Sequence, residues 1–152
     1  MRFIGRFLIS TLLLLALQSP ATAGDKGTAD EAKAMVDRAV ALIESQGASS
    51  AYATFNDGKD GFRDRDLYVF VADFQGKLLA HGAKKQLVGK SLLNLKDPDG
   101  KAFMQEFISV GKGSGSGWVD YKWPNPVTDK VEQKSSYIQR VGDTLVGVGI
   151  YK

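Results

Sequence analysis

Two aromatic residues and a lysine near the C-terminal end of the sequence have the composition of a binding pocket. Tyr121 and Trp123 lie in the run Gly117–Pro126, and Lys134 follows after a short polar stretch. An ammonium group beside aromatic rings, in a site of reduced dielectric, pairs well with a carboxylate, and such a charge-assisted hydrogen bond contributes about 1.5–3 kcal/mol. These residue types predict a small, partly apolar pocket that holds one organic anion.

The spacing of these residues predicts which of them share a face. Alternate residues of a strand point the same way, so Val119, Tyr121 and Trp123 form one face of their strand. Lys134 and Tyr137 are three residues apart, so only one of them faces the pocket unless a bulge intervenes. We expect Lys134 to contact the ligand and Tyr137 to be structural.

Three strands must position these side chains. They are predicted over residues 118–123, 131–141 and 144–151. The short links between them favour an antiparallel meander. Gly147 and Gly149 leave one face of the last strand bare, which suits either the close approach of a ligand or the close packing of a helix.

The upstream half predicts one long helix followed by a hairpin. Apolar residues recur at helical spacing from Thr28 to about Tyr52. Two apolar runs, 66–73 and 77–81, then flank a glycine-containing turn, as in a β-hairpin. The first run is apolar on both faces, which indicates a central strand, and Tyr68 within it offers a further hydroxyl donor.

His81 is the only histidine in the chain, and it closes the second apolar run. With no cysteine and no second histidine, it cannot anchor a conventional zinc site. Both a pocket contact and a surface hydrogen-bonding role remain open for it. Further along, Asp97 is expected to cap a helix that has Pro98 in its first turn and ends at Gly111.

The sequence favours neither a metal site nor a catalytic site. Two acidic loops, 56–67 and 95–106, resemble calcium loops but lack a carboxylate at the twelfth and the first position, respectively. The chain has no cysteine nucleophile and no nucleophile-elbow motif. We expect no enzyme and no cofactor, and a redox or cofactor-binding module is the weakest of the alternatives.

The first 23 residues, Met1–Ala23, have the parts of a secretory signal peptide. Two arginines precede an apolar run over 7–17, and small residues follow at Ala21–Ala23. The apolar run is shorter than the roughly 20 residues of a spanning helix. We therefore expect export and a mature chain that forms one domain over residues 24–152.

Charge and cysteine content restrict the partners and the stability of that mature chain. Loss of Arg2 and Arg6 leaves 18 Lys and Arg against 17 Asp and Glu, a net charge of +1. This balance argues against nucleic acid or an anionic membrane surface as partner. Because the chain has no cysteine, its stability must come from a buried core.

Seven short segments of the chain follow one another in an order typical of a known family. They are Tyr68–Val71, Gly76–His81, Gly89–Leu92, Asp97–Gly100, Gly117–Pro124, Lys134–Tyr137 and Gly147–Tyr151. Over residues 30–152 the chain resembles a bacterial single Cache domain of the second type. The resemblance implies an α+β fold, with a long N-terminal helix packed on a PAS-like antiparallel sheet of about five strands. It also implies an extracytoplasmic sensor of small molecules, often short carboxylates.

The resemblance also selects among the candidate site residues. It implies that the Lys-x-x-Tyr element of Lys134 and Tyr137 lies on the pocket strand and that His81 borders the ligand. Strand periodicity alone favours a solvent-exposed side chain for Lys134. It is equally consistent with Tyr121, Trp123 and Tyr68 being ordinary core residues. The expected ligand-binding residues are Lys134, Tyr121, Trp123, His81 and Tyr68.

The functional expectation is a periplasmic or secreted sensor that binds a short carboxylate and acts in signal transduction or chemotaxis. The sequence ends at Lys152 with no signalling domain, which favours a stand-alone form that acts through a membrane receptor or histidine kinase. The main alternative is a protein-interaction module with a vestigial pocket. In that case the helix over 28–52 or a sheet edge would dock the partner.

Overall fold

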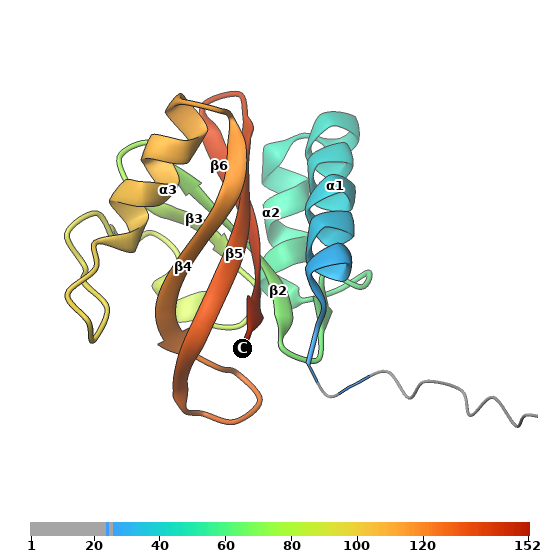
Figure 1. The fold of residues 1–152 in the computed structure, drawn as a ribbon. Helices are drawn as coiled ribbons and strands as arrows, with labels where there is room; N and C mark the ends of the chain where they lie inside the picture. The colour runs from blue at the N-terminus through green and yellow to red at the C-terminus, as the bar shows by residue number, and fades with distance from the viewer. Residues whose placement is uncertain (1–23, 25) are drawn as a thin grey trace, which may run out of the picture.

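The computed structural model describes Gly24 and residues 26–152, and the predicted signal peptide lies outside the described residues. An antiparallel sheet lies between two helices on one side and a third helix on the other (Figure 1). The helices are α1 (Ala29–Gln46), α2 (Ala48–Asp57) and α3 (Phe103–Lys112), with a 3-10 turn at Lys85–Leu87. The strands are β1 (Arg63–Asp64), β2 (Leu67–Asp73), β3 (Leu78–His81), β4 (Ser116–Pro124), β5 (Val131–Val141) and β6 (Thr144–Tyr151). The expected α+β fold is confirmed.

The sheet runs in the order β1-β2-β6-β5-β4, and β3 also pairs with β2. All pairs are antiparallel, and β4, β5 and β6 form the predicted meander. The two-residue β1 brings the sheet to six strands rather than about five. The register sets Lys134 directly between Tyr121 on β4 and Tyr151 on β6, which brings these three residues together on one face.

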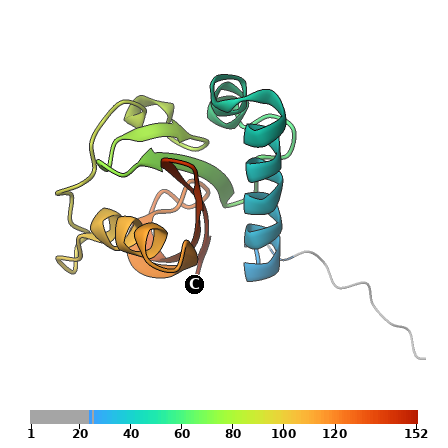
Figure 2. The same ribbon diagram turned by 90° about the horizontal axis from the view of Figure 1, so that it is seen from above.

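The expected single N-terminal helix is two helices that meet at Gly47. Thr28 begins α1 with a capping box, in which its hydroxyl accepts from the Glu31 backbone and the Glu31 carboxylate accepts from the Thr28 backbone. Gly47 has φ 82°, which a residue without a Cβ adopts readily, and this conformation breaks the helix. Both helices lie against the same face of the sheet (Figure 2). No helix in the described part of the chain combines the length and apolar character that a membrane crossing requires.

The expected cap of α3 at Asp97 is wrong, because the helix begins only at Phe103. Asp97 instead organises the loop before the helix. Its Oδ1 accepts hydrogen bonds from the backbone of Asp99 and Lys101, and its Oδ2 accepts one from the backbone of Lys122 at 2.9 Å. Its carboxylate thus ties this loop to β4, which places α3 over the sheet.

The two faces of the sheet bury different side chains. The face toward α1 and α2 is mainly aliphatic, with Leu67, Val69, Val71, Val146 and Val148 from the central strands. The face toward α3 is mainly aromatic, with Tyr68, Phe70, Tyr121 and Tyr151 from the sheet and Phe103 and Phe107 from the helix. The strict alternation along β2 confirms the prediction of a central strand covered on both sides.

Candidate functional site

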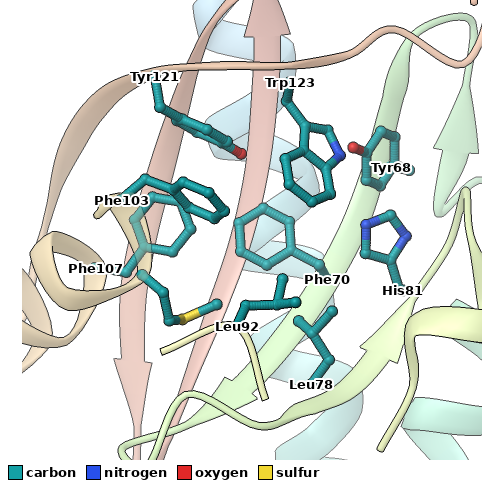
Figure 3. A pocket seen from close by; sticks show the side chains of 10 residues that line it. Tyr68, Phe70, Leu78, His81, Leu92, Phe103, Phe107, Tyr121 and Trp123 are labelled. Atoms are coloured by element: carbon teal, nitrogen blue, oxygen red, sulfur yellow. The ribbon is translucent and has the colours of Figure 1, made fainter. Parts of the chain in front are cut away.

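A pocket lies between α3 and the aromatic face of the sheet (Figure 3). Its cavity volume is about 20 Å³, which is room for about one water molecule. Pockets for drug-sized ligands measure roughly 300–1,000 Å³, so this one suits a ligand of a few heavy atoms. The lining side chains are Tyr68, Phe70, Leu78, His81, Leu92, Phe103, Met104, Phe107, Tyr121 and Trp123.

One half of the pocket is apolar and is built largely by α3. The Phe103 ring stacks on Tyr121, with ring centroids 4.7 Å apart, and Phe107 stacks on Phe70 at 5.6 Å. Met104 completes this wall. The residue types and spacing used above do not assign these helix residues to the site. Their helical spacing was a usable signal, because an apolar helix face must cover something.

Lys134 is fully buried and lies behind the polar half of the pocket. Its Nζ donates a hydrogen bond to the Tyr68 hydroxyl at 2.6 Å and lies 4.0 Å from the centroid of that ring. It is not among the lining side chains, so Tyr68 separates it from the pocket. None of the ion pairs among the described residues includes Lys134. Burial lowers the pKa of Lys134 well below its usual value.

The Tyr68 hydroxyl accepts a hydrogen bond from Lys134 Nζ, and within the described part of the chain its own hydrogen has only a distant partner. The Tyr151 hydroxyl lies 3.4 Å away and itself donates to the Pro124 carbonyl at 2.8 Å. The indole nitrogen of Trp123 also points toward the Tyr68 oxygen (Figure 3). Burial raises the pKa of Tyr68, so the hydroxyl stays protonated. Its hydrogen is therefore available to an acceptor in the pocket.

His81 is neutral, and its hydrogen bonds determine which ring nitrogen carries the proton. Its Nδ1 accepts from the backbone N–H of Lys84 at 2.9 Å and of Ala83 at 3.3 Å. Burial, followed by the positive charges of Lys134 and Lys84, lowers the pKa of His81 to about 3. Because Nδ1 is an acceptor, the single proton must sit on Nε2. The imidazole thus presents a neutral N–H donor.

Tyr121 contributes a wall to the pocket. Its hydroxyl lies 3.0 Å from the hydroxyl of Ser136, and its pKa is raised by burial. Tyr137 lies on the opposite face of β5, where its ring is 5.4 Å from Trp118 and beneath the ammonium group of Lys33. The register of β5 is regular, so Lys134 and Tyr137 point to opposite faces as their spacing predicts.

The bare strip at Gly147 and Gly149 faces the pocket side of the sheet, not α1. A Cβ at Gly149 would overlap the side chains of Lys134 and Ser136, and one at Gly147 would overlap Phe70. The alternative in which a helix packs on these glycines is therefore wrong. The strip makes room for the Lys134 side chain to cross β6.

Proteins with known roles match this chain. A methyl-accepting chemotaxis protein, McpP of Pseudomonas putida, is 32% identical over 90 residues, which cover 58% of this chain and 16% of the relative. A sensor histidine kinase, MctS of Rhizobium johnstonii, is 30% identical over 145 residues, which cover 94% of this chain and 28% of the relative. The chain thus spans less than a third of either relative.

Solved structures share the fold. A methyl-accepting chemotaxis protein of Vibrio parahaemolyticus superposes with a TM-score of 0.69 at 27% identity, covering 80% of this chain and 86% of the other. The periplasmic sensor domain of a chemotaxis protein gives 0.63 at 28% identity, covering 80% and 88%. A Cache chemosensory domain described for its carboxylic acid recognition gives 0.62 at 24% identity, covering 80% and 86%.

The family profile described as single Cache domain 2 matches residues 14–152. That range includes every helix and strand of the described fold and every lining residue of the pocket. The chain is homologous to the sensor domains of chemotaxis receptors and sensor kinases, and its family is one of sensors rather than catalysts. It belongs to the single Cache domain 2 family.

Proposed function

We propose that this chain is an extracytoplasmic sensor domain that reversibly binds a short carboxylate in the pocket beneath α3. The observation that carries the proposal is the set of donors at its polar end. His81 presents a neutral Nε2–H, because Nδ1 is occupied by two backbone donors. Tyr68 presents a hydroxyl that Lys134 contacts from behind. A cluster of donors beside a buried lysine favours an anionic acceptor, because a bound carboxylate would stabilise the charged form of that lysine.

The carboxylate would accept from Tyr68, His81 and the Trp123 indole. Lys134 would supply the positive charge from behind Tyr68, strengthening the Tyr68 donor. Hydrogen bonds to a charged group contribute about 1.5–3 kcal/mol each when they are formed out of water. This arrangement differs from the direct lysine contact that the sequence suggests, because Tyr68 stands between Lys134 and the pocket.

The apolar half would set the length of the ligand. Phe70, Phe103 and Phe107 are held by ring contacts, whereas Met104 is unbranched and adapts its shape. The pocket has free width for about one water molecule, so only a tail of a few carbons fits after a small adjustment. We therefore propose acids of two to four carbons as the ligand class.

The partner we propose is a membrane receptor or histidine kinase. The support comes from the two relatives, which are a chemotaxis protein and a sensor histidine kinase. A periplasmic location is supported by the fold neighbour that is a periplasmic sensor domain. Ligand occupancy would reach the partner only if the ligand binds two conformations of the domain with different affinity.

The experiment is thermal unfolding of the chain from Gly24 with carboxylates, amino acids, amines and purines in large excess. A ligand at 100 times its Kd adds about 2.7 kcal/mol, which shifts the Tm of a domain of this size by several degrees. We expect a shift confined to short carboxylates and lost in Lys134→Met. The control is Lys122→Met. Lys122 is on the other face of β4 and forms an ion pair with Asp99.

Absence of a shift with every compound would overturn the carboxylate sensor. A stable complex with a membrane protein under the same conditions would then support the interaction module. A Tm shift with amines or purines but not with acids would support a small-molecule sensor and contradict short carboxylates as its ligands.

A further inference from the structure

The last turn of α2 holds the end of the strand that carries His81. The backbone N–H of His81 donates a hydrogen bond to Oδ1 of Asn56 at 2.8 Å. In the pairing with β2, the next residue, Gly82, is the one that donates to the Val69 carbonyl, at 2.9 Å. Because successive N–H groups of a strand point to opposite sides, the His81 N–H points away from β2. Asn56 therefore supplies a partner that this strand pair does not provide.

Two further contacts join the same turn of α2 to the residues after His81. Nζ of Lys85 donates to Oδ1 of Asp57 at 2.9 Å. Gly82 lies against the carbonyl of Phe55, and a Cβ at this glycine would be only 3.1 Å from that oxygen. The last three residues of α2 thus each contact the turn that follows β3.

This turn also orients the imidazole. The backbone N–H groups of Ala83 and Lys84 donate to Nδ1 of His81, and they are two and three residues further along the chain. A hydrogen bond weakens steeply as its angle departs from linearity, so Nδ1 keeps both donors only while the strand end and the turn hold their relative positions. Nε2 lies across the ring from Nδ1, and its direction is fixed by the same contacts.

Asn56 reaches His81 at the edge of the sheet. α2 buries Ala51 and Phe55 in the aliphatic core, on the face away from the pocket. β3 pairs with β2 and with no other of the described strands, so its second edge is open to α2. At this edge a helix from the opposite layer contacts a residue that lines the pocket.

We propose that Asn56 is a positioning residue for the carboxylate site, which acts through His81 and does not touch the ligand. This inference rests on the proposed function. By holding the backbone of His81, Asn56 keeps Nδ1 under its two donors and directs the Nε2–H to the ligand carboxylate. Without the Asn56 oxygen, the end of β3 loses this anchor and the imidazole samples other orientations. Affinity then falls, because the donor must be ordered when the ligand binds.

The test is a double-mutant cycle on the chain from Gly24. Calorimetry measures propionate affinity in the wild type, Asn56→Ala, His81→Asn and the double variant. If Asn56 acts through His81, its loss reduces affinity only where the imidazole is present, so the two effects are not additive. The control is Thr54→Ala, which removes a side-chain hydrogen bond to the Ser50 carbonyl within the same helix.

We expect propionate to bind about three- to tenfold more weakly to Asn56→Ala, because part of one hydrogen bond to the ligand is lost. Adding Asn56→Ala to His81→Asn should cause no further loss, and Thr54→Ala should bind as the wild type does. No loss in Asn56→Ala, or an equal loss with and without the imidazole, would overturn the inference. The equal loss is what a merely structural role of Asn56 predicts.

The imidazole itself gives a second readout, because His81 is the only histidine of the chain. In an untagged, ¹⁵N-labelled chain, NMR distinguishes a ring with its proton fixed on Nε2 from one that exchanges between both nitrogens. The wild type and Thr54→Ala should show the Nε2–H form, and Asn56→Ala should show a mixture. A pure Nε2–H form in Asn56→Ala would also overturn the inference.

Failure of the proposed function is distinguishable from failure of this inference. If the wild type binds no carboxylate, the sensor proposal fails, and the imidazole spectrum alone decides whether Asn56 positions His81. If Asn56→Ala does not fold, Asn56→Leu removes the acceptor oxygen and keeps a side chain of similar size. In that variant a mixture of tautomers supports the inference, and a pure Nε2–H form overturns it.

Discussion

The two faces of the sheet are built from the same strands but bury different kinds of side chain. The face toward α1 and α2 buries Val69, Val71 and Val148 against small helix residues such as Ala32 and Ala39. The face toward α3 buries aromatic rings together with a lysine, a histidine and hydroxyl groups around a pocket. Aliphatic burial stabilises the fold, whereas each buried polar group reduces that gain unless it is well paired. The aliphatic core and the candidate site are thus separated by the thickness of one sheet.

A single strand contributes side chains to both faces. On β5, Lys134 and Ser136 point to the pocket side, and Tyr137 points to the helix side. A change on the helix face should therefore alter stability with little effect on ligand affinity, whereas a change on the pocket face should alter ligand affinity. The following predictions test that rule from the largest expected effect to the smallest.

The largest effect is expected in the acid sensitivity of the pocket face. The folded pKa of His81, about 3, is below the usual value of 6.5, so the unfolded state binds a proton between these two pH values. Stability from His81 is present above pH 6.5 and is lost as the pH falls toward 3, by about 3 kcal/mol between pH 7 and 4. Chemical denaturation across this range should show a flatter profile in His81→Asn. An equally steep profile in the variant would contradict the buried, neutral imidazole.

On the helix face, Met35→Ala should lower the free energy of unfolding by about 2–4 kcal/mol. Met35 is buried in the aliphatic core, and the truncation leaves a cavity there. Carboxylate affinity should change less than twofold, because the site lies on the other face of the sheet. Urea denaturation and calorimetry on the same samples measure the two quantities. A parallel loss of affinity would show that the faces are coupled.

On the pocket face, Lys134→Met should show the reverse pattern. We expect carboxylate affinity to fall about 10- to 100-fold, because one charge-assisted interaction is lost. Stability should stay equal or rise by about 1–3 kcal/mol, since an incompletely paired buried charge is replaced by an apolar chain of similar length. Calorimetry and urea denaturation again give both values. Unchanged affinity for every acid would remove Lys134 from the site.

Gly149→Ala should disturb the pocket through Lys134. The added methyl group overlaps Lys134 and Ser136, so the lysine must leave its place beside Tyr68. We expect an affinity loss of about threefold or more and a stability loss of about 1–2 kcal/mol. Titration calorimetry and a melting curve test this change. Wild-type affinity in a folded Gly149→Ala protein would show that the position of Lys134 does not matter.

The smallest effect is expected for Tyr137→Phe. The Tyr137 ring packs between Trp118 and Lys33 on the helix face, and the substitution keeps the ring. Affinity and stability should both stay within about 0.5 kcal/mol of the wild type, as is usual for a change that leaves packing intact. The same two assays apply. A tenfold affinity loss would place Tyr137 in the site, against its orientation.

Local patterns in the sequence were enough for the strands and their faces. The limits of β5 and β6, the meander, and the opposite orientations of Lys134 and Tyr137 all follow from period-two spacing and turn residues. The helices were predicted less well. A single glycine at position 47 was read as part of one helix, although its positive φ splits it. Asp97 looked like a helix cap because its long-range hydrogen bond to the Lys122 backbone has no local signal.

The sequence by itself determined which residue types are present and which face of each strand they occupy, because side-chain direction in a strand depends only on spacing. The tertiary structure decided what lies next to what. It set Tyr68 between Lys134 and the pocket, assigned the proton of His81 to Nε2, covered the site with Phe103 and Phe107, and joined the Asp66 carboxylate to the Gly27 backbone. These relations join segments distant in the chain, and strand register and helix packing specify them only when the whole core is assembled.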